Sequence, residues 1–185
     1  MRCAYILTLL CLALAQAACN FQNRGLVINE VMASNDNAWH DEWGEDEDYI
    51  ELVNTTGHAI RLGGYVLGDA SGKRSALPDV ELKSGEVYML VADAAPEQGP
   101  NHLPFRISSK GDVLVLGDAH GFAVERVELP PLGINATVQR FPNGRGELVV
   151  CDYASPAADN GPSCAALEHE TAKKKKSKTK APRLD

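Results

Sequence analysis

Two short segments with alternating apolar residues constrain this chain more than any other feature of its sequence. In residues 26–33 the alternation predicts that Glu30 shares one face with Ile28, while Val31 lies on the other face. Residues 49–53 alternate in the same way. A period of two over segments this short is typical of strands that bury one face in a core. The two segments therefore predict neighbouring strands of a β-sheet.

Residues 34–48, between these segments, form a strongly acidic insert that also contains Trp39 and Trp43. Carboxylates at close spacing supply the hard oxygen ligands that calcium prefers. The calcium candidates are Asp41, Glu45, Asp46 and Asp48. The spacing matches no helical calcium loop, so a solvated acidic loop is the alternative, and no other cofactor is indicated. The two tryptophans either cover the edge of the sheet or offer a contact surface to a partner.

The rest of the chain alternates between short strand-like segments and turns rich in Gly, Pro, Asn and Asp. The further strand-like segments are residues 60–62, 65–67, 80–82, 87–92, 105–107, 113–116, 122–129, 138–141 and 148–150. Strands at intervals of about ten residues, almost without helical periodicity, predict an all-β sandwich. Residues 67–72 and 116–121 match closely but their flanks do not, so we interpret them as recurring hairpin turns.

The N-terminal residues 1–18 have the pattern of a secretory signal, with a basic start, a short apolar run and small residues before the cleavage point. The apolar run is too short for a transmembrane helix. Ala17-Ala18-Cys19 resembles the end of a bacterial lipobox, which implies a lipid on Cys19; ordinary cleavage that leaves a thiol is the alternative. Residues 19–25 are then a short tether. We expect an exported protein, held at the bacterial outer membrane or cell surface, or otherwise secreted.

Cys151 and Cys164 enclose a short segment near the C-terminus. In an oxidising compartment they are expected to pair and close the loop of residues 151–167, with a stabilisation of about 3 kcal/mol. Residues 168–185 follow as a tail whose like charges predict disorder. Its lysines are candidates for contact with anionic polymers, a solubilising terminus being the alternative: Lys173, Lys174, Lys175, Lys176, Lys178 and Lys180.

Charge and motifs exclude several function classes. Residues 20–167 contain 22 acidic and ten basic side chains, so this body repels nucleic acid, and only the lysine tail offers an attractive charge. There is no Gly-x-Ser-x-Gly elbow, no phosphate-binding glycine loop and no His-Glu-x-x-His. The five histidines are scattered without metal-ligand spacing, and a surface position is expected for each. The sequence therefore predicts no enzyme and names no catalytic residue.

Residues 26–150, taken in order, resemble the lamin tail domain family. The matching stretches are Ile28–Val31, Asp48–Asn54, Leu62–Leu67 with Asp69, Leu82–Leu90, Ile107–Gly111, Val113–Leu116 with Asp118 and Gly121, and Arg140–Gly144. The resemblance implies an immunoglobulin-like β-sandwich that acts as a binding or structural module. It implies no ligand and no catalytic residue, and the coiled-coil rod of lamins is absent.

Together these observations predict a non-enzymatic, exported interaction module that is anchored to a membrane through Cys19. The partner would be a protein or a polymer of the cell envelope, and the sequence does not indicate an oligomeric state. One alternative is a calcium-dependent adhesion or matrix-binding domain that uses residues 34–48. The other is an accessory domain that serves a separately encoded secreted enzyme.

Overall fold

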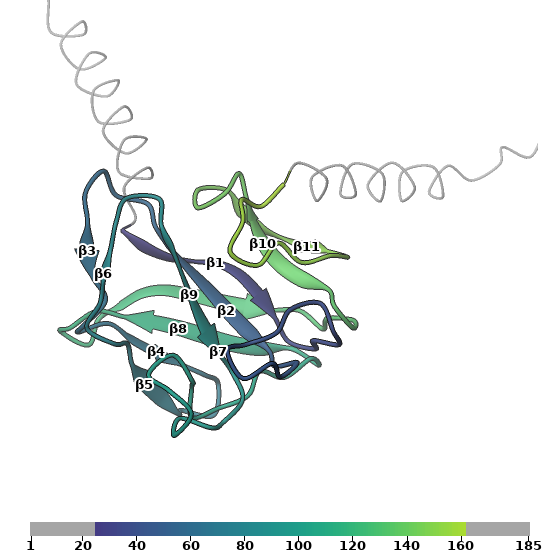
Figure 1. Cartoon of the computed structure of the whole chain (residues 1–185). Coiled ribbons are helices and arrows are strands. Elements are labelled where there is room, and N and C mark those ends of the chain that lie inside the picture. Colours follow the sequence, from purple (N-terminus) through teal and green to yellow (C-terminus); the bar gives the residue numbers. More distant parts are fainter. Residues whose placement is uncertain (1–24, 162–185) are drawn as a thin grey trace, which may run out of the picture.

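The computed structural model describes residues 25–161, which form two larger β-sheets and one small sheet (Figure 1). The strands, in chain order, are β1 (Leu26–Met32), β2 (Tyr49–Asn54), β3 (Ile60–Arg61), β4 (Val66–Gly68), β5 (Arg74–Ala76), β6 (Glu81–Leu82), β7 (Val87–Val91), β8 (Asp112–Gly117), β9 (Ala123–Leu129), β10 (Thr137–Phe141) and β11 (Glu147–Cys151). Within this part of the chain no helix has the length and apolar character needed to cross a membrane.

The two larger sheets are antiparallel and enclose the core between them. One has the order β11-β10-β1-β2-β7, the second has the order β5-β4-β8-β9, and β3 pairs with β6 separately. Leucines dominate the core, with isoleucine, valine and a single phenylalanine, Phe105. The predicted sandwich is confirmed. Two details of the prediction are wrong: residues 74–76 form a strand that the alternation did not reveal, and residues 105–107 form none beyond a single bridge at Arg106.

A β-bulge in β1 reverses part of the predicted alternation. Ile28 pairs with Leu52, but the next paired residue of β1 is Glu30, so Asn29 is an extra residue in the strand. An inserted residue of this kind shifts the following side chains to the opposite face. Val31 therefore joins Ile28 in the core, while Glu30 turns to the outer face of the five-stranded sheet. The sequence had placed both on the wrong faces.

The outer face of the five-stranded sheet is covered by residues 152–161, which we call the strap. Ser155 of the strap donates from its backbone N–H (2.9 Å) and its hydroxyl (2.6 Å) to Glu30, and the N–H of Ala157 donates to Glu51 (2.9 Å). With the core on one face and the strap over Glu30 and Glu51 on the other, every residue of β1 and β2 is buried. Burial raises the pKa of Glu51 to about 7, although hydrogen bonds from Asn29 and Ala157 oppose that rise.

Cys151 ends β11 as a fully buried residue beside the start of the strap. Its expected partner, Cys164, lies outside the described residues, so the pairing stays a prediction. The structure shows that hydrogen bonds also attach the strap to the sheet. The strap is held to the sheet by hydrogen bonds to side chains of β1, β2 and β10.

The two similar turns of the sequence have the same structure. In each one an aspartate, Asp69 or Asp118, accepts a hydrogen bond from the backbone N–H four residues later, and a glycine with positive φ, Gly72 or Gly121, completes the turn. The interpretation as recurring hairpin turns is confirmed. Leu67 of β4 pairs with Leu116 of β8 in antiparallel register, so a local twofold relationship connects the two hairpins.

Candidate functional site: the acidic lobe

The acidic insert and residues 93–106 pack against each other at one end of the five-stranded sheet. The insert joins the end of β1 to the start of β2, and residues 93–106 follow β7, so the two segments lie at the same end of neighbouring strands (Figure 1). We call them together the acidic lobe. The strand order thus brings together segments about sixty residues apart in sequence.

Asn35 fixes both ends of the insert. Its side-chain amide donates to the carbonyls of Trp39 (2.6 Å) and Glu47 (2.9 Å), and its own backbone N–H donates to Asp48 (3.1 Å). Burial is the main reason that the pKa of Asp48 rises to about 6, and the neighbouring charge of Glu47 adds to the effect. These bonds make the insert an ordered loop with closed ends.

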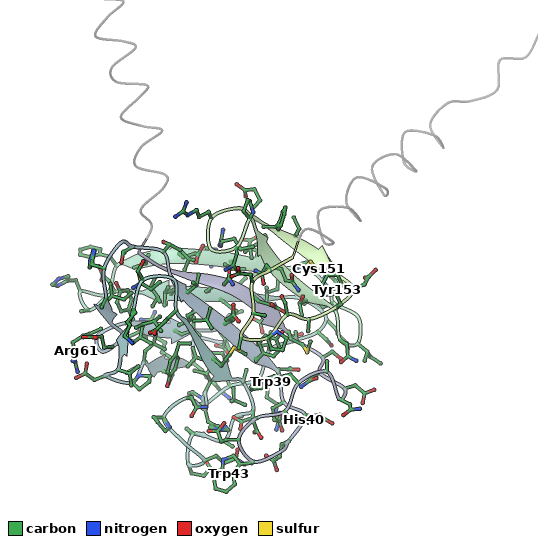
Figure 2. The ribbon with its side chains drawn as sticks, turned by 45° about the horizontal axis from the view of Figure 1, so that its top comes forward. Trp39, His40, Trp43, Arg61, Cys151 and Tyr153 are labelled. Carbon is green, nitrogen blue, oxygen red and sulfur yellow. The ribbon has the colours of Figure 1, made fainter. Side chains whose placement is uncertain are left out.

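The two tryptophans occupy different environments. Trp39 is half-buried and packs edge-on against Tyr49, with ring centroids 5.2 Å apart, so it covers the edge of the sheet. Trp43 is 63% exposed. It lies at the far tip of the lobe, whereas Trp39 lies close to the sheets (Figure 2). The first reading therefore fits Trp39, while a contact with a partner through Trp43 stays a prediction.

A tight turn around Asp41 presents Trp43 at this tip. Oδ1 of Asp41 accepts the backbone N–H groups of Trp43 (2.8 Å) and Glu45 (2.9 Å), and the N–H of Asp41 donates back to the carbonyl of Glu45 (3.1 Å). An aspartate that bonds its own backbone in this way stabilises a turn. The local sequence thus fixes an exposed tryptophan among carboxylates.

His102 connects the two segments of the lobe. Its side chain is fully buried, with Nδ1 2.6 Å from Asp93 and Nε2 3.2 Å from Glu42. Burial by itself would lower the pKa of His102, but the hydrogen bonds and charges of Asp93 and Glu42 outweigh it and raise the pKa. The expectation of a surface position is wrong for this histidine, because its two acidic partners come from distant parts of the sequence.

The geometry of His102 also bears on catalysis. In this structure both ring nitrogens contact carboxylates, Nδ1 that of Asp93 and Nε2 that of Glu42. Within residues 25–161, no group of three or more His, Cys, Asp or Glu side chains is arranged to hold a metal ion. His102 therefore acts here as a connection between segments.

The four calcium candidates are not gathered into one site. Asp41 caps the turn, Asp46 pairs with His40 (2.8 Å), Asp48 accepts from Asn35, and Glu45 accepts from Gln98 (3.2 Å). One oxygen of Asp41, Oδ2, is buried and has no hydrogen-bond partner among residues 25–161. Calcium binding stays a prediction that this arrangement does not favour.

Calcium titration gives a direct measurement. Each of the four carboxylates contacts a different group, so they do not form one calcium site. We therefore expect 10 mM calcium to change the melting temperature of the full chain by less than about 1 °C. Binding with a dissociation constant a hundred times below that concentration would instead add about 2.7 kcal/mol of stability. A calcium-dependent rise that Asp41→Asn abolishes would contradict the expectation, and magnesium at the same concentration controls for ionic strength.

Several predicted site residues lie outside residues 25–161. These are the lipidation candidate Cys19, the cysteine Cys164, and the tail lysines Lys173, Lys174, Lys175, Lys176, Lys178 and Lys180. Their roles stay predictions.

The two antiparallel sheets define a class of protein: an immunoglobulin-like β-sandwich, here with an ordered acidic lobe at one end. The family model for the Lamin Tail Domain matches residues 20–130. The chain therefore belongs to the lamin tail domain family, as the sequence resemblance indicated. Domains of this family are immunoglobulin-like interaction domains that are generally non-enzymatic. A comparison with curated proteins finds no match.

Proposed function

We propose that this protein is an exported interaction module, held at the cell envelope, that contacts its partner through the acidic lobe. The observation that carries the proposal is Trp43, which is 63% exposed at the tip of a loop with fixed ends. Large exposed aromatic side chains are frequent at the centres of binding interfaces. A partner with basic and apolar surface would suit the surrounding carboxylates.

The ordered structure of the lobe supports this role. Asn35 closes the insert, the turn at Asp41 orients Trp43, and His102 attaches the insert to the loop that follows β7. A contact surface that is ordered before binding loses less conformational entropy when the complex forms. The lobe therefore has the properties of a preformed contact surface.

Export and anchoring are separate parts of the proposal. They rest on the N-terminal pattern of residues 1–18 and on Cys19, with the lysine tail as a second contact for anionic envelope polymers. The mass of the N-terminal peptide from a membrane fraction measures the anchor. A peptide that begins at Cys19 or earlier without lipid would exclude acylation.

Photo-crosslinking tests the contact surface. We expect a photoreactive amino acid at position 43 of the full chain to capture a partner in cells that make the protein. The matched control is the same amino acid at position 122, because Phe122 is similarly exposed (71%) but lies in the turn between β8 and β9. Trp43→Ser should abolish capture from a third position within the lobe, such as 40. Equal capture at positions 43 and 122, or capture that survives Trp43→Ser, would contradict the proposal.

A further inference from the structure

A cleft of about 800 Å³ lies at the other end of the five-stranded sheet, where β2 ends and β7 begins. It is lined by the residues that follow β2, by the turn between β6 and β7, by the turn between β10 and β11, and by Asp159 of the strap. The volume falls within the range of small-molecule sites, which is roughly 300–1,000 Å³. We call it the end cleft, and it shares no residue with the acidic lobe.

One wall of the end cleft is organised by Asn54. This side chain is fully buried, and its amide donates to the carbonyls of His58 (2.8 Å) and Leu82 (2.9 Å) while its oxygen accepts from the N–H of Thr56 (2.9 Å). The hydroxyl of Ser84 also donates to the carbonyl of Thr56 (2.5 Å). The loops on this side are therefore fixed to each other before any ligand arrives.

The opposite wall is fixed by the turn between β10 and β11. Gly144 has a φ of +66°, and a Cβ at this position would lie 3.1–3.2 Å from side-chain atoms of Thr55 and Val53, so the turn packs closely against the end of β2. Asn143 accepts from the amide of Asn29 (2.8 Å) and donates to Asp159 (2.8 Å). This wall is thus connected to the hydrogen-bond network under the strap.

Arg145 supplies the positive charge of the end cleft. Among residues 25–161, four arginines form ion pairs with carboxylates, namely Arg61, Arg106, Arg126 and Arg140. Arg145 is exposed and is not one of them. In a body with more than twice as many acidic as basic residues, this leaves an arginine available to a ligand. Planar guanidinium groups bind carboxylates through two parallel hydrogen bonds.

The remaining lining is rich in small polar groups. The hydroxyl oxygens of Thr56 and Ser84 and the carboxylate of Asp159 can accept hydrogen bonds from a ligand, and Pro142 with Val53 offers a limited apolar surface. A peptide that adds a strand is disfavoured, since β2 is already paired on both sides with β1 and β7. We propose that the end cleft binds an acidic saccharide, with its carboxylate on Arg145 and its hydroxyls on Asp159, Ser84 and Thr56.

Titration of the full chain with trigalacturonic acid, followed by calorimetry, tests the proposal. We expect saturable binding that weakens as salt increases, and at least tenfold weaker binding for Arg145→Ala. The matched control is Arg74→Ala, which removes an exposed arginine that forms no ion pair among the described residues and lies outside the end cleft. Maltotriose, which is uncharged, should bind at least tenfold more weakly than the acid.

Three results would overturn the assignment. The first is that trigalacturonic acid does not bind to the unmodified chain. The second is that Arg145→Ala and Arg74→Ala lose the same amount of affinity for it. The third is that a short peptide with a free C-terminal carboxylate, at the same concentration as the sugar, displaces the sugar from the chain. Circular dichroism of both variants checks that they fold. Crosslinking at position 43 is independent of the end cleft, so a failure here leaves the proposed function of the acidic lobe standing.

Discussion

Replacing Arg140 by methionine is expected to lower the free energy of unfolding by about 3–5 kcal/mol, the range for removing one partner of a buried ion pair. Arg140 lies on β10 and is 4% exposed. Its guanidinium donates to Glu125 of β9 in the opposite sheet and to the carbonyls of Ile28 (3.1 Å) and Gly146 (2.7 Å). The variant leaves the largely buried Glu125 without its cation and removes the guanidinium donors from two carbonyls, so the loss is large.

Chemical denaturation monitored by circular dichroism measures this loss. The matched control is Arg126→Met, because Arg126 pairs with Glu128 on the solvent side of β9 and is largely exposed. An exposed pair of this kind contributes about 0–1 kcal/mol. If the two variants lose similar amounts of stability, the contacts that Arg140 makes between the two sheets do not stabilise the fold as expected. The double variant Arg140→Met with Glu125→Leu should recover part of the loss, since it removes the orphaned charge as well.

The second large effect is a fall in stability as the pH rises from about 5 to about 8. Folding raises the pKa of Glu51 from its usual 4.5 to about 7, so the folded protein binds this proton more tightly than the unfolded chain does. Stability from such a group is fully present below pH 4.5 and is lost as the pH rises through about 7. The raised pKa values of Asp48 and His102 act in the same direction. For Glu51 alone the change corresponds to about 3 kcal/mol.

The structural reason for this effect is that, among the described residues 25–161, no cation contributes to the pKa of Glu51, whereas burial and neighbouring carboxylates raise it. Its carboxylate lies on the outer face of the sheet with Glu30, Tyr49 and, across the strap, Asp159 as the facing titratable groups, and Asn29 and Ala157 as donors. Ionisation of Glu51 therefore places a buried negative charge beside the buried carboxyl group of Glu30. The strap should loosen first, since it lies directly over the two carboxylates.

Melting temperatures and hydrogen exchange of residues 152–161 between pH 5 and pH 8 measure both consequences. Glu51→Gln should flatten the pH dependence even if it lowers stability at pH 5, because the titrating group is gone. Glu128→Gln, at an exposed position of β9, should keep the dependence of the unmodified chain. An unchanged pH profile in Glu51→Gln would show that Glu51 is not the group responsible.

The sequence could predict the strands because most of them bury only one face. Alternation places Leu52 and Ile50 in the core correctly, and the turn residues separate one strand from the next. It fails at Asn29, since the bulge depends on the side chain of Asn29 reaching Glu51 and on Gly144 donating to it, contacts made with residues far along the chain. The alternation also fails to predict the strand at residues 74–76, because this short and largely exposed edge strand contains too few apolar residues to show a pattern.

The candidate site was partly visible in the sequence. The carboxylates and the two tryptophans of residues 34–48 indicate an unusual loop, and the turn at Asp41 follows from local chemistry. The role of His102 could not be predicted, because it depends on which loops the strand order brings together. The polar lining of the end cleft was hidden for the same reason. Four separate segments contribute to it, and none of them is distinctive alone.

The strap determines where an isolated, expressed version of this domain has to end. The family model ends at residue 130, but β10 sits between β1 and β11 inside the five-stranded sheet. A fragment that stops at the end of the match would leave residues 30–32 of β1 without their partner strand β10 and would remove the strap that covers Glu30 and Glu51. An expressible unit of this protein therefore has to extend to at least residue 161, some thirty residues beyond its recognisable signature.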